Sequence, residues 1–222
     1  MTQSIALLDL DKNPNIGLFL VANEKFCLCG YNVTEKKRKS IEKILGVPCY
    51  EVRVLGTDLC GVFLACNNDI LLSPELFPHE EKVLQEICKK HEVELVCLDL
   101  RVNAIGNNLC LGDKEVLVGA ETDKVALAYF KKKKYKVHTL KNKEFEAAGS
   151  VVSFIKGKYI VSQELEEKDL KGILSKIAVV TSVNRGSPFV ASGIVGTSKG
   201  LLLGSLSTTI EIQNIAEGLE YL

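Results

Sequence analysis

The sequence predicts one α/β (α+β) domain built as a closed ring of five strand-strand-helix-strand units. Three observations predict it: a glycine that recurs at spacings of 43 to 45 residues, a hairpin pattern after each of these glycines, and a surplus strand near the N-terminus. A repeat of this length is typical of an array of similar structural units. The recurring anchor glycines are Gly17, Gly61, Gly106, Gly149 and Gly193.

A hairpin is predicted after every anchor glycine. A polar turn follows each glycine, and a short apolar run follows each turn, which is the pattern of two antiparallel strands. The turns are Asn23–Lys25, Asn67–Asp69, Gly112–Lys114, Lys156–Lys158 and Ser198–Gly200. The apolar runs are FCLCG, ILLSP, EVLVG, YIVSQ and LLLGS.

A helix is predicted after every hairpin, from apolar residues at i, i+3 and i+4. In the first unit Thr34 is the expected N-cap. The third helix, around 125–130, is short and ends in a lysine run. The apolar faces of the other four helices are Ile41, Ile44 and Leu45; Val83, Leu84, Ile87 and Cys88; Leu170, Ile173, Leu174 and Ile177; and Ile212, Ile215, Leu219 and Leu222.

A third strand follows the helix in units one to four, in the segments CYEVRVL, ELVCLDL, YKVHTL and IAVVTSV. The fifth unit lacks one, whereas the segment SIALLDL precedes the first anchor. The N-terminal strand is therefore expected to complete the fifth unit and close the ring, which removes free sheet edges. The predicted repeats span approximately 16–59, 60–104, 105–147, 148–191, and 192–222 completed by 4–10.

The composition favours a folded, intracellular protein. Hydrophobic residues make up 46% of the chain and charged residues 25%, with 28 basic and 28 acidic residues. A broad basic face for nucleic acid is not expected from this balance, although a local patch stays open. No secretion signal is expected in the first residues, and no apolar run has the length of a membrane span.

The eight cysteines are expected to be reduced and to pack as small hydrophobic residues. The chain has no CxxC pair, so no metal site is expected. Cys27-Leu28-Cys29 should place both thiols on one face of a strand, with core packing favoured over metal or redox chemistry.

The segment 181–193, TSVNRGSPFVASG, places charged and turn-forming residues between two strand-like runs. It lacks the spacing of a phosphate-binding loop. Two interpretations stay open. The first is a tight turn between units, with Gly186 supplying a permissive backbone and Arg185 pairing locally. The second is direct contact with a partner.

Several motifs resemble those of one family. They are Asn15-Ile16-Gly17, Ala104-Ile105-Gly106-Asn107, Ser182-Val183-Asn184-Arg185-Gly186-Ser187 with Val190–Val195, and Ser207-Thr208-Thr209-Ile210-Glu211. Together with the five-unit ring they resemble the ribosome anti-association factors of the translation initiation factor six family. That family has the pentein fold, a five-fold pseudosymmetric α/β-propeller. The absence of a polar tail after the fifth helix makes the chain more similar to archaeal members.

The resemblance implies binding and no catalysis. A member of this family would bind the joining face of the large ribosomal subunit, near the sarcin–ricin loop, and block the small subunit. Its partners would be ribosomal proteins, with ribosomal RNA as a further candidate. No catalytic residue, cofactor, small-molecule substrate or membrane is implied, and the protein is expected to be a cytoplasmic monomer. The expected ribosome-binding residues are Asn107, Asn67, Arg101, Asn184, Arg185 and Ser187.

Some of these residues have a simpler structural interpretation. Asn107 could instead serve a left-handed turn. The run Lys131–Lys134 could contact ribosomal RNA, but solvated lysines at a helix C-terminus are favoured. His79, His91 and His138 are expected at the surface or at helix ends.

Two other functions stay as alternatives. Guanidine-modifying enzymes share the pentein fold and use a late cysteine nucleophile, a histidine and carboxylates. Here no cysteine follows Cys110 and no histidine follows His138, which disfavours an enzyme. A ring-shaped interaction module with another partner is the third hypothesis, because a fold alone does not define a function.

Overall fold

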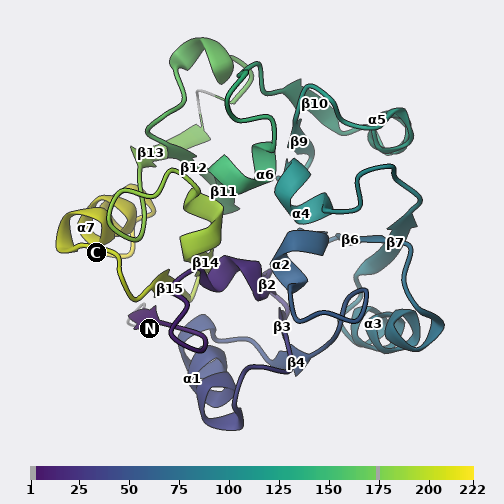
Figure 1. Ribbon diagram of the computed structural model, residues 1–222, viewed down its shortest axis with the longest axis horizontal. Helices are drawn as coiled ribbons and strands as arrows, with labels where there is room; N and C mark the ends of the chain where they lie inside the picture. Colours follow the sequence, from purple (N-terminus) through teal and green to yellow (C-terminus); the bar gives the residue numbers. More distant parts are fainter. Residues whose placement is uncertain (1–3, 174–175) are drawn as a thin grey trace.

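The computed structural model describes residues 4–173 and 176–222 and has five small sheets arranged in a ring (Figure 1). Each sheet has three strands, and the predicted five-unit ring is confirmed. In every sheet the second strand is central: it pairs antiparallel with the first strand and parallel with the third.

The elements follow the same order around the ring. Unit one holds η1 (Ile16–Leu18), β2 (Leu20–Ala22), β3 (Cys27–Cys29), α1 (Glu35–Leu45) and β4 (Cys49–Glu51). Unit two holds α2 (Cys60–Phe63), β5 (Ala65–Cys66), β6 (Ile70–Pro74), α3 (Pro78–Lys90) and β7 (Glu94–Leu98). Unit three holds α4 (Ile105–Asn108), β8 (Leu109–Leu111), β9 (Glu115–Val118), α5 (Lys124–Lys132) and β10 (Lys136–Thr139).

The last two units differ in how they are completed. Unit four holds α6 (Ala148–Val151), β11 (Val152–Ile155), β12 (Lys158–Ser162), η2 (Glu167–Asp169) and β13 (Ile177–Thr181). Unit five holds η4 (Val190–Gly193), β14 (Ile194–Gly196), β15 (Gly200–Gly204) and α7 (Thr209–Gly218). Its third strand is β1 (Ser4–Leu8), which pairs in parallel with β15 and closes the ring as predicted.

Helix caps follow the sequence signals. The Thr34 side chain accepts a hydrogen bond from the Lys37 amide at the start of α1, as predicted, and Gly46 ends that helix in a left-handed conformation. Thr208 and Glu211 form a capping box at the start of α7. Each cap satisfies backbone groups that the first or last helical turn leaves unpaired.

The fourth helix differs from the prediction. Residues 167–169 form a short 3-10 turn, and Leu170 and Ile173 are buried beyond it. Ile177 is the first residue of β13, so its assignment to a helix face was wrong. Leu174 lies outside the described residues. The apolar spacing arises because Leu170 and Ile173, after the turn, and Ile177, in the strand, all pack against the same core cluster.

The anchor glycines form a ring of close backbone contacts. A Cβ on Gly61 would overlap the carbonyl oxygen of Gly17, and the same relation links Gly106 to Gly61 and Gly149 to Gly106. A Cβ on Gly17 would overlap the carbonyl oxygen of Ala191. The fifth anchor is therefore Ala191, the second residue of η4, and the choice of Gly193 was wrong by two residues.

The core consists of five clusters of buried side chains, distributed around the ring. Cys27, Cys29 and Cys49 share one cluster, whereas Leu28 belongs to the next, so the two thiols of the CxC segment do face the same way. The first strands of the units surround a central channel of about 120 Å³. None of the helices in the described ranges has the length and apolar character to cross a bilayer.

The ring has two faces. The seam face carries the loops that join each third strand to the next short helical turn, together with the starts of the long helices. These loops are residues 9–15, 52–59, 99–104, 140–147 and 182–189. The opposite, hairpin face carries the turns between the first and second strands and the ends of the long helices.

Candidate functional site

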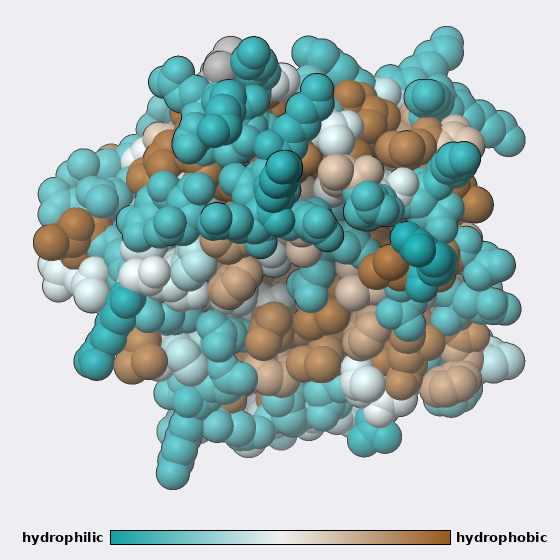
Figure 2. All heavy atoms as spheres, turned by 45° about the horizontal axis from the view of Figure 1, so that its top comes forward, coloured by the Kyte–Doolittle hydropathy of each residue, from teal (hydrophilic) through white to brown (hydrophobic). Residues whose placement is uncertain are grey.

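The mouth of the central channel on the seam face is the candidate site. It is a depression of about 410 Å³, and among the described residues that line it none carries a charge. Figure 2 shows hydrophobic side chains gathered around a hollow below the centre of the view. The polar lining residues are Asn15, Asn107, Ser150, Ser187 and Ser192.

Asn107 is at the mouth because it is the third residue of the short helix α4. The equivalent positions in η1, α6 and η4 are Leu18, Ser150 and Ser192, which also line the mouth. The Asn107 side chain is half-buried and forms no hydrogen bond within the described residues. Asn107 is not among the residues with a positive φ, so a left-handed turn does not explain it. Its amide is open to a partner.

The loop 182–187 is a tight turn between units four and five. Asn184, Arg185 and Gly186 all have positive φ angles, and Val183 and Ser187 exchange backbone hydrogen bonds. The buried carboxylate of Glu211 accepts hydrogen bonds from the Ser182 hydroxyl at 2.8 Å and the Gly186 amide at 2.9 Å. The turn interpretation of this segment is therefore correct for its backbone.

Glu211 stays ionised in this position. Burial raises the pKa of the Glu211 carboxyl, but hydrogen bonds from the Thr208, Gly186 and Arg185 amides and the Ser182 hydroxyl outweigh burial and leave the pKa below its usual value. One carboxylate thus caps α7 and holds the seam loop at the same time. Glu80 holds the seam loop of unit two in a similar way, accepting hydrogen bonds from the Leu55 and Gly56 amides, but it does not cap α3.

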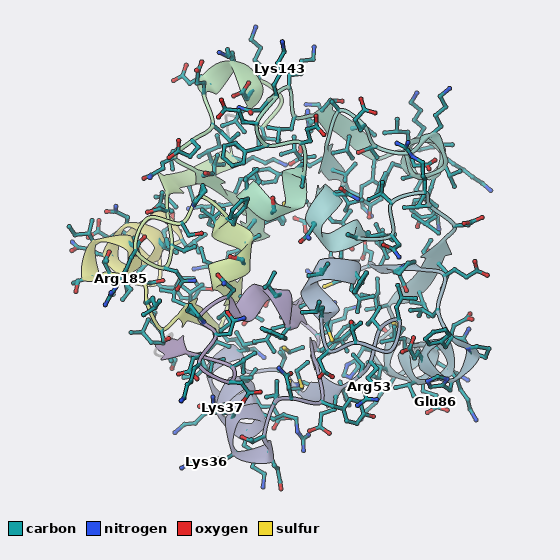
Figure 3. All side chains as sticks on the ribbon, in the orientation of Figure 1. Lys36, Lys37, Arg53, Glu86, Lys143 and Arg185 are labelled. Atoms are coloured by element: carbon teal, nitrogen blue, oxygen red, sulfur yellow. The ribbon has the colours of Figure 1, made fainter. Side chains whose placement is uncertain are left out.

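The side chains of this loop divide between internal and external roles. The Asn184 amide donates to the Pro14 carbonyl at 3.1 Å and to the Asn15 side-chain oxygen at 3.3 Å, so it joins the loop to the N-terminal segment. Arg185 is exposed at the periphery of the ring (Figure 3), and its guanidinium forms no ion pair within residues 4–173 and 176–222. The predicted local pairing of Arg185 is made by its backbone amide, which donates a hydrogen bond to the Glu211 carboxylate.

Arg101 lies on the same face as Asn107 but further out. It is exposed in the loop between β7 and α4, and its backbone amide donates to the Asp123 carboxylate at 3.3 Å. Hydrogen bonds from the backbone amides of Val125 and, to a smaller extent, Arg101 lower the pKa of the Asp123 carboxyl below its usual value. The loop is thereby held against the start of α5.

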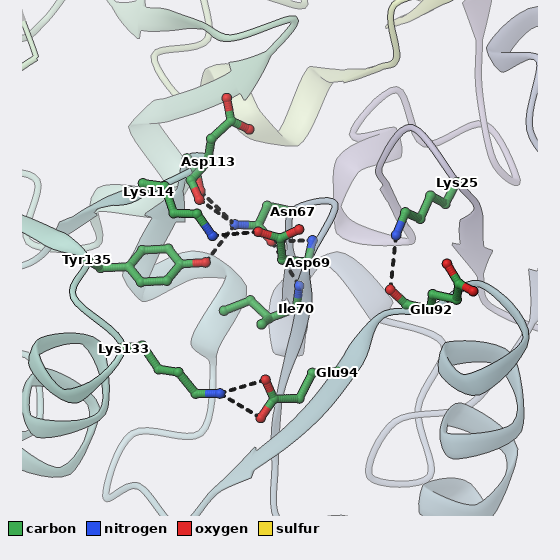
Figure 4. A network of polar contacts seen from close by, with 11 residues as sticks. Lys25, Asn67, Asp69, Ile70, Glu92, Glu94, Asp113, Lys114, Lys133 and Tyr135 are labelled. Atoms are coloured by element: carbon green, nitrogen blue, oxygen red, sulfur yellow. Dashed lines mark hydrogen bonds and ion pairs between the residues drawn. The ribbon is translucent and has the colours of Figure 1, made fainter.

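Asn67 lies on the opposite, hairpin face (Figure 4). Its side chain is 7% exposed and donates to the Gly112 carbonyl at 2.8 Å and the Tyr135 hydroxyl at 3.1 Å. Its oxygen accepts hydrogen bonds from the Asp69 and Ile70 amides. Because every polar atom of this side chain is used internally, Asn67 joins units two and three, and we leave it out of the candidate site.

Apolar side chains exposed on the seam face were missed by sequence reasoning. Five of them are between 43% and 57% exposed, and each lies in a seam loop or just before a long helix: Tyr31, Phe77, Val102, Phe189 and Leu206. Phe189 also lines the mouth. Tyr31, Phe77 and Leu206 shortly follow the ends of β3, β6 and β15, whereas Val102 and Phe189 lie inside seam loops. Large apolar side chains in predicted loops were the signal that could have identified them.

The histidines lie away from the mouth. His79 is exposed and His91 caps α3, as expected. His138 is 9% exposed, so its predicted surface position was wrong. Its Nε2 lies 3.2 Å from the buried Glu115 carboxylate, which also pairs with Lys176 at 2.5 Å.

The Glu115 cluster joins units three and four. Burial raises the pKa of Glu115, but hydrogen bonds from Lys176 and His138 outweigh burial and lower the pKa below its usual value. Its members come from β9, β10 and the segment before β13. Within the described ranges, no three His, Cys, Asp or Glu side chains are grouped as a metal site.

Two solved structures share the fold. One is a dimethylarginine dimethylaminohydrolase adduct, with a TM-score of 0.51 and 11% identity over 93% of this chain and 75% of that chain. The other is the N-terminal domain of ArgZ, a cyanobacterial arginine dihydrolase, with a TM-score of 0.51 and 11% identity over 83% of each chain. At this identity the likeness shows the pentein fold and does not extend to activity.

Sequence comparison shows the family. The protein is 30% identical to the translation initiation factor 6 of Staphylothermus marinus over 97% of both chains. It is 28% identical to that of Saccharolobus islandicus, over 92% of this chain and 94% of the relative. It is 25% identical to that of Thermococcus onnurineus, over 98% and 99% of the two chains. The eIF-6 family matches residues 5–218, and this chain therefore belongs to that family, whose relatives are translation initiation factors.

Proposed function

We propose that the protein binds the joining face of the large ribosomal subunit through its seam face and thereby prevents association with the small subunit. The observation that carries this proposal is the uncharged depression at the mouth of the ring, found here in a member of the eIF-6 family. There the Asn107 amide, which has no hydrogen-bond partner among the described residues, lies at the mouth of a face with exposed Tyr31, Phe77 and Phe189. Protein interfaces are enriched in such aromatic residues.

The chemistry of the seam face favours a largely protein-containing partner surface. The mouth is uncharged among its described lining residues, and hydroxyl and amide groups supply its polar atoms. Exposed apolar side chains surround it, which suits a docked protein surface better than a phosphate backbone. We expect ribosomal proteins as the main contacts, with the protein acting as a monomer in the cytoplasm.

The proposed mechanism is occlusion without chemistry. The five sheets and the close contacts between anchor residues make a rigid body, and blocking a surface requires only rigidity and affinity. The enzymes that share the fold do not change this proposal, because residues 139–222 contain neither cysteine nor histidine. A ring-shaped module for another partner is the remaining alternative.

The experiment is a subunit-joining assay. Purified large and small subunits are mixed with increasing protein, and joined particles are followed by light scattering and by sucrose-gradient sedimentation. The proposal expects joined particles to decrease with protein concentration and the protein to migrate with the large subunit. If joining proceeds normally at saturating protein, the proposal is wrong and the alternative partner is favoured.

A further inference from the structure

The hairpin face of units two and three carries a dense group of lysines. We call this group the lysine sector, and it includes the ends of α3 and α5, the hairpin turn of unit three and the start of β10. All its members are exposed: Lys89, Lys90, Lys114, Lys131, Lys132, Lys133, Lys134 and Lys136. The net charge of zero for the whole chain conceals this local excess.

Contacts between units hold the sector together (Figure 4). Lys114 pairs with Asp69 at 2.7 Å, and Lys133 pairs with Glu94 at 2.7 Å. The Lys136 amide donates to the Lys114 carbonyl at 3.0 Å. The end of α5, the hairpin turn of unit three and unit two therefore form one continuous surface.

These pairs leave a positive surplus. They occupy Asp69 and Glu94. Among the described residues, Glu86, Glu92 and Asp113 are further carboxylates near these lysines, and Glu115 lines the same depression as Lys136. The eight lysines outnumber these six carboxylates. The Lys90 ammonium lies 5.4 Å from the centre of the Tyr50 ring. The side chains of five lysines form neither a salt bridge nor a hydrogen bond within the parts of the chain described above: Lys89, Lys131, Lys132, Lys134 and Lys136.

We propose that the lysine sector binds the phosphate backbone of RNA. Several unpaired ammonium groups on one rigid surface are suited to a polyanion with closely spaced phosphates. None of the large apolar side chains exposed in the described residues belongs to the sector, so it has nothing to insert into a lipid bilayer. The nearby Tyr135 is buried, which leaves no exposed ring of its own for base stacking. Binding should therefore depend on phosphates and tolerate any sequence.

The sector is separate from the proposed subunit-binding site. It lies on the hairpin face, whereas Asn107 and the mouth lie on the seam face. A protein docked through the seam face would still present these lysines to a second partner. The two proposals therefore predict opposite effects for two sets of variants.

The test uses fluorescence anisotropy of a labelled RNA hairpin with the full-length protein. The variant is Lys131→Gln, Lys132→Gln and Lys134→Gln combined. Its matched control, with the same change of charge, is Lys12→Gln, Lys36→Gln and Lys143→Gln. These lysines are exposed, lie in seam loops or at the start of α1, and have side chains without a salt bridge or hydrogen bond in the described part of the chain. Figure 3 labels Lys36 and Lys143. The Kd for RNA should rise about tenfold or more in the sector variant and change less than about threefold in the control.

Salt dependence supplies the second readout. Loss of three phosphate contacts should reduce the slope of log affinity against log salt by about 2 between about 50 and 200 mM salt. An unchanged slope, or an equal loss of affinity in the control, would overturn the proposal. So would binding of polyglutamate or anionic lipid vesicles as tight as that of RNA.

A sedimentation assay separates the two proposals. The sector variant should still sediment with large subunits, whereas Asn107→Arg should lose the subunit and keep RNA binding. If the sector variant loses large-subunit binding as well, the lysines belong to the subunit contact and the idea of a second surface is wrong.

Discussion

The Glu211 carboxylate accepts a hydrogen bond from the Gly186 amide at 2.9 Å, although 25 residues separate them. The same carboxylate accepts hydrogen bonds from the Thr208 amide and from the Ser182 hydroxyl. One buried acid therefore fixes the start of α7 and the shape of the seam loop together. The loop is held in position without using the side chains of Arg185 or Ser187.

Replacing Glu211 should destabilise the fold. Glu211→Ala leaves several amide donors without an acceptor, and we expect a loss of about 2–4 kcal/mol in the free energy of unfolding. Urea unfolding at neutral pH measures this change. Glu217→Ala, an exposed position on the same helix, should alter stability by less than about 0.5 kcal/mol.

The contribution of Glu211 should also depend on pH. Because its folded pKa is below the unfolded one, its stabilising effect is complete above the unfolded pKa and is lost as pH falls through the folded pKa. The stability difference between the native protein and Glu211→Gln should therefore shrink as pH is lowered through this range. A constant difference at all pH values would contradict the assignment.

Asn184 should be essential to ring closure. Its amide nitrogen faces two acceptors, the Pro14 carbonyl and the Asn15 side-chain oxygen. Asn184→Asp places a third acceptor there, and we expect a loss of about 1–3 kcal/mol, with faster hydrogen exchange in β1. Asn214→Asp on the exposed side of α7 is the control. Equal effects of both changes would show that the contact contributes nothing.

Adding a methyl group at Gly61 should destabilise the ring of close contacts between the anchor residues. The added Cβ would overlap the backbone of Gly17 and Leu20, and neither can move without shifting the neighbouring unit. We expect Gly61→Ala to cost about 2 kcal/mol or more by urea unfolding. Ala191→Gly, at the equivalent position of unit five, should cost less than about 1 kcal/mol. A reversed order would mean that the anchor contacts are not tight.

The ring was predictable because its signals are local. A hairpin turn followed by an apolar run recurs in every unit, and the surplus N-terminal strand indicates closure. The fifth anchor was misplaced because that position holds alanine: it requires only a small residue next to the neighbouring backbone, as Ala191 shows. The unit-four helix failed because a turn followed by a strand produced the same apolar spacing.

The candidate site was less predictable because its residues depend on contacts between units. Asn67 and Asn107 both follow apolar segments, yet carbonyl and hydroxyl groups of unit three fix the Asn67 side chain, whereas the Asn107 side chain has no hydrogen-bond partner in residues 4–173 and 176–222. The different roles of Asn67 and Asn107 depend on how the neighbouring units are arranged around each side chain. Ser150 and Ser192 share the position of Asn107 and could have been found from a correct anchor alignment.

The cysteines should react very unequally in the folded protein. Burial raises the pKa of the Cys66 thiol to about 12 and that of Cys88 to about 11. Partial burial and then the nearby Glu81 and Glu75 carboxylates also raise the pKa of Cys97, but its side chain is exposed to the reagent. Alkylation by iodoacetamide near pH 8 requires an accessible thiolate, so we expect Cys97 to be modified first. Mass spectrometry over time should show one early adduct in native protein and eight in denaturant. Simultaneous modification of all eight in native protein would contradict the buried, reduced core.

Asn107→Arg is the direct test of the mouth as a binding site. A bulky cation at the centre of an uncharged depression would clash with a docked surface and remain poorly solvated, so we expect large-subunit affinity to fall at least about tenfold. Co-sedimentation with purified large subunits measures this loss. Thermal unfolding should be unchanged, because the Asn107 side chain makes no hydrogen bond to any part of the chain that the structure describes. Asn214→Arg, exposed on α7, should bind like the native protein, and equal binding by both variants would remove Asn107 from the interface.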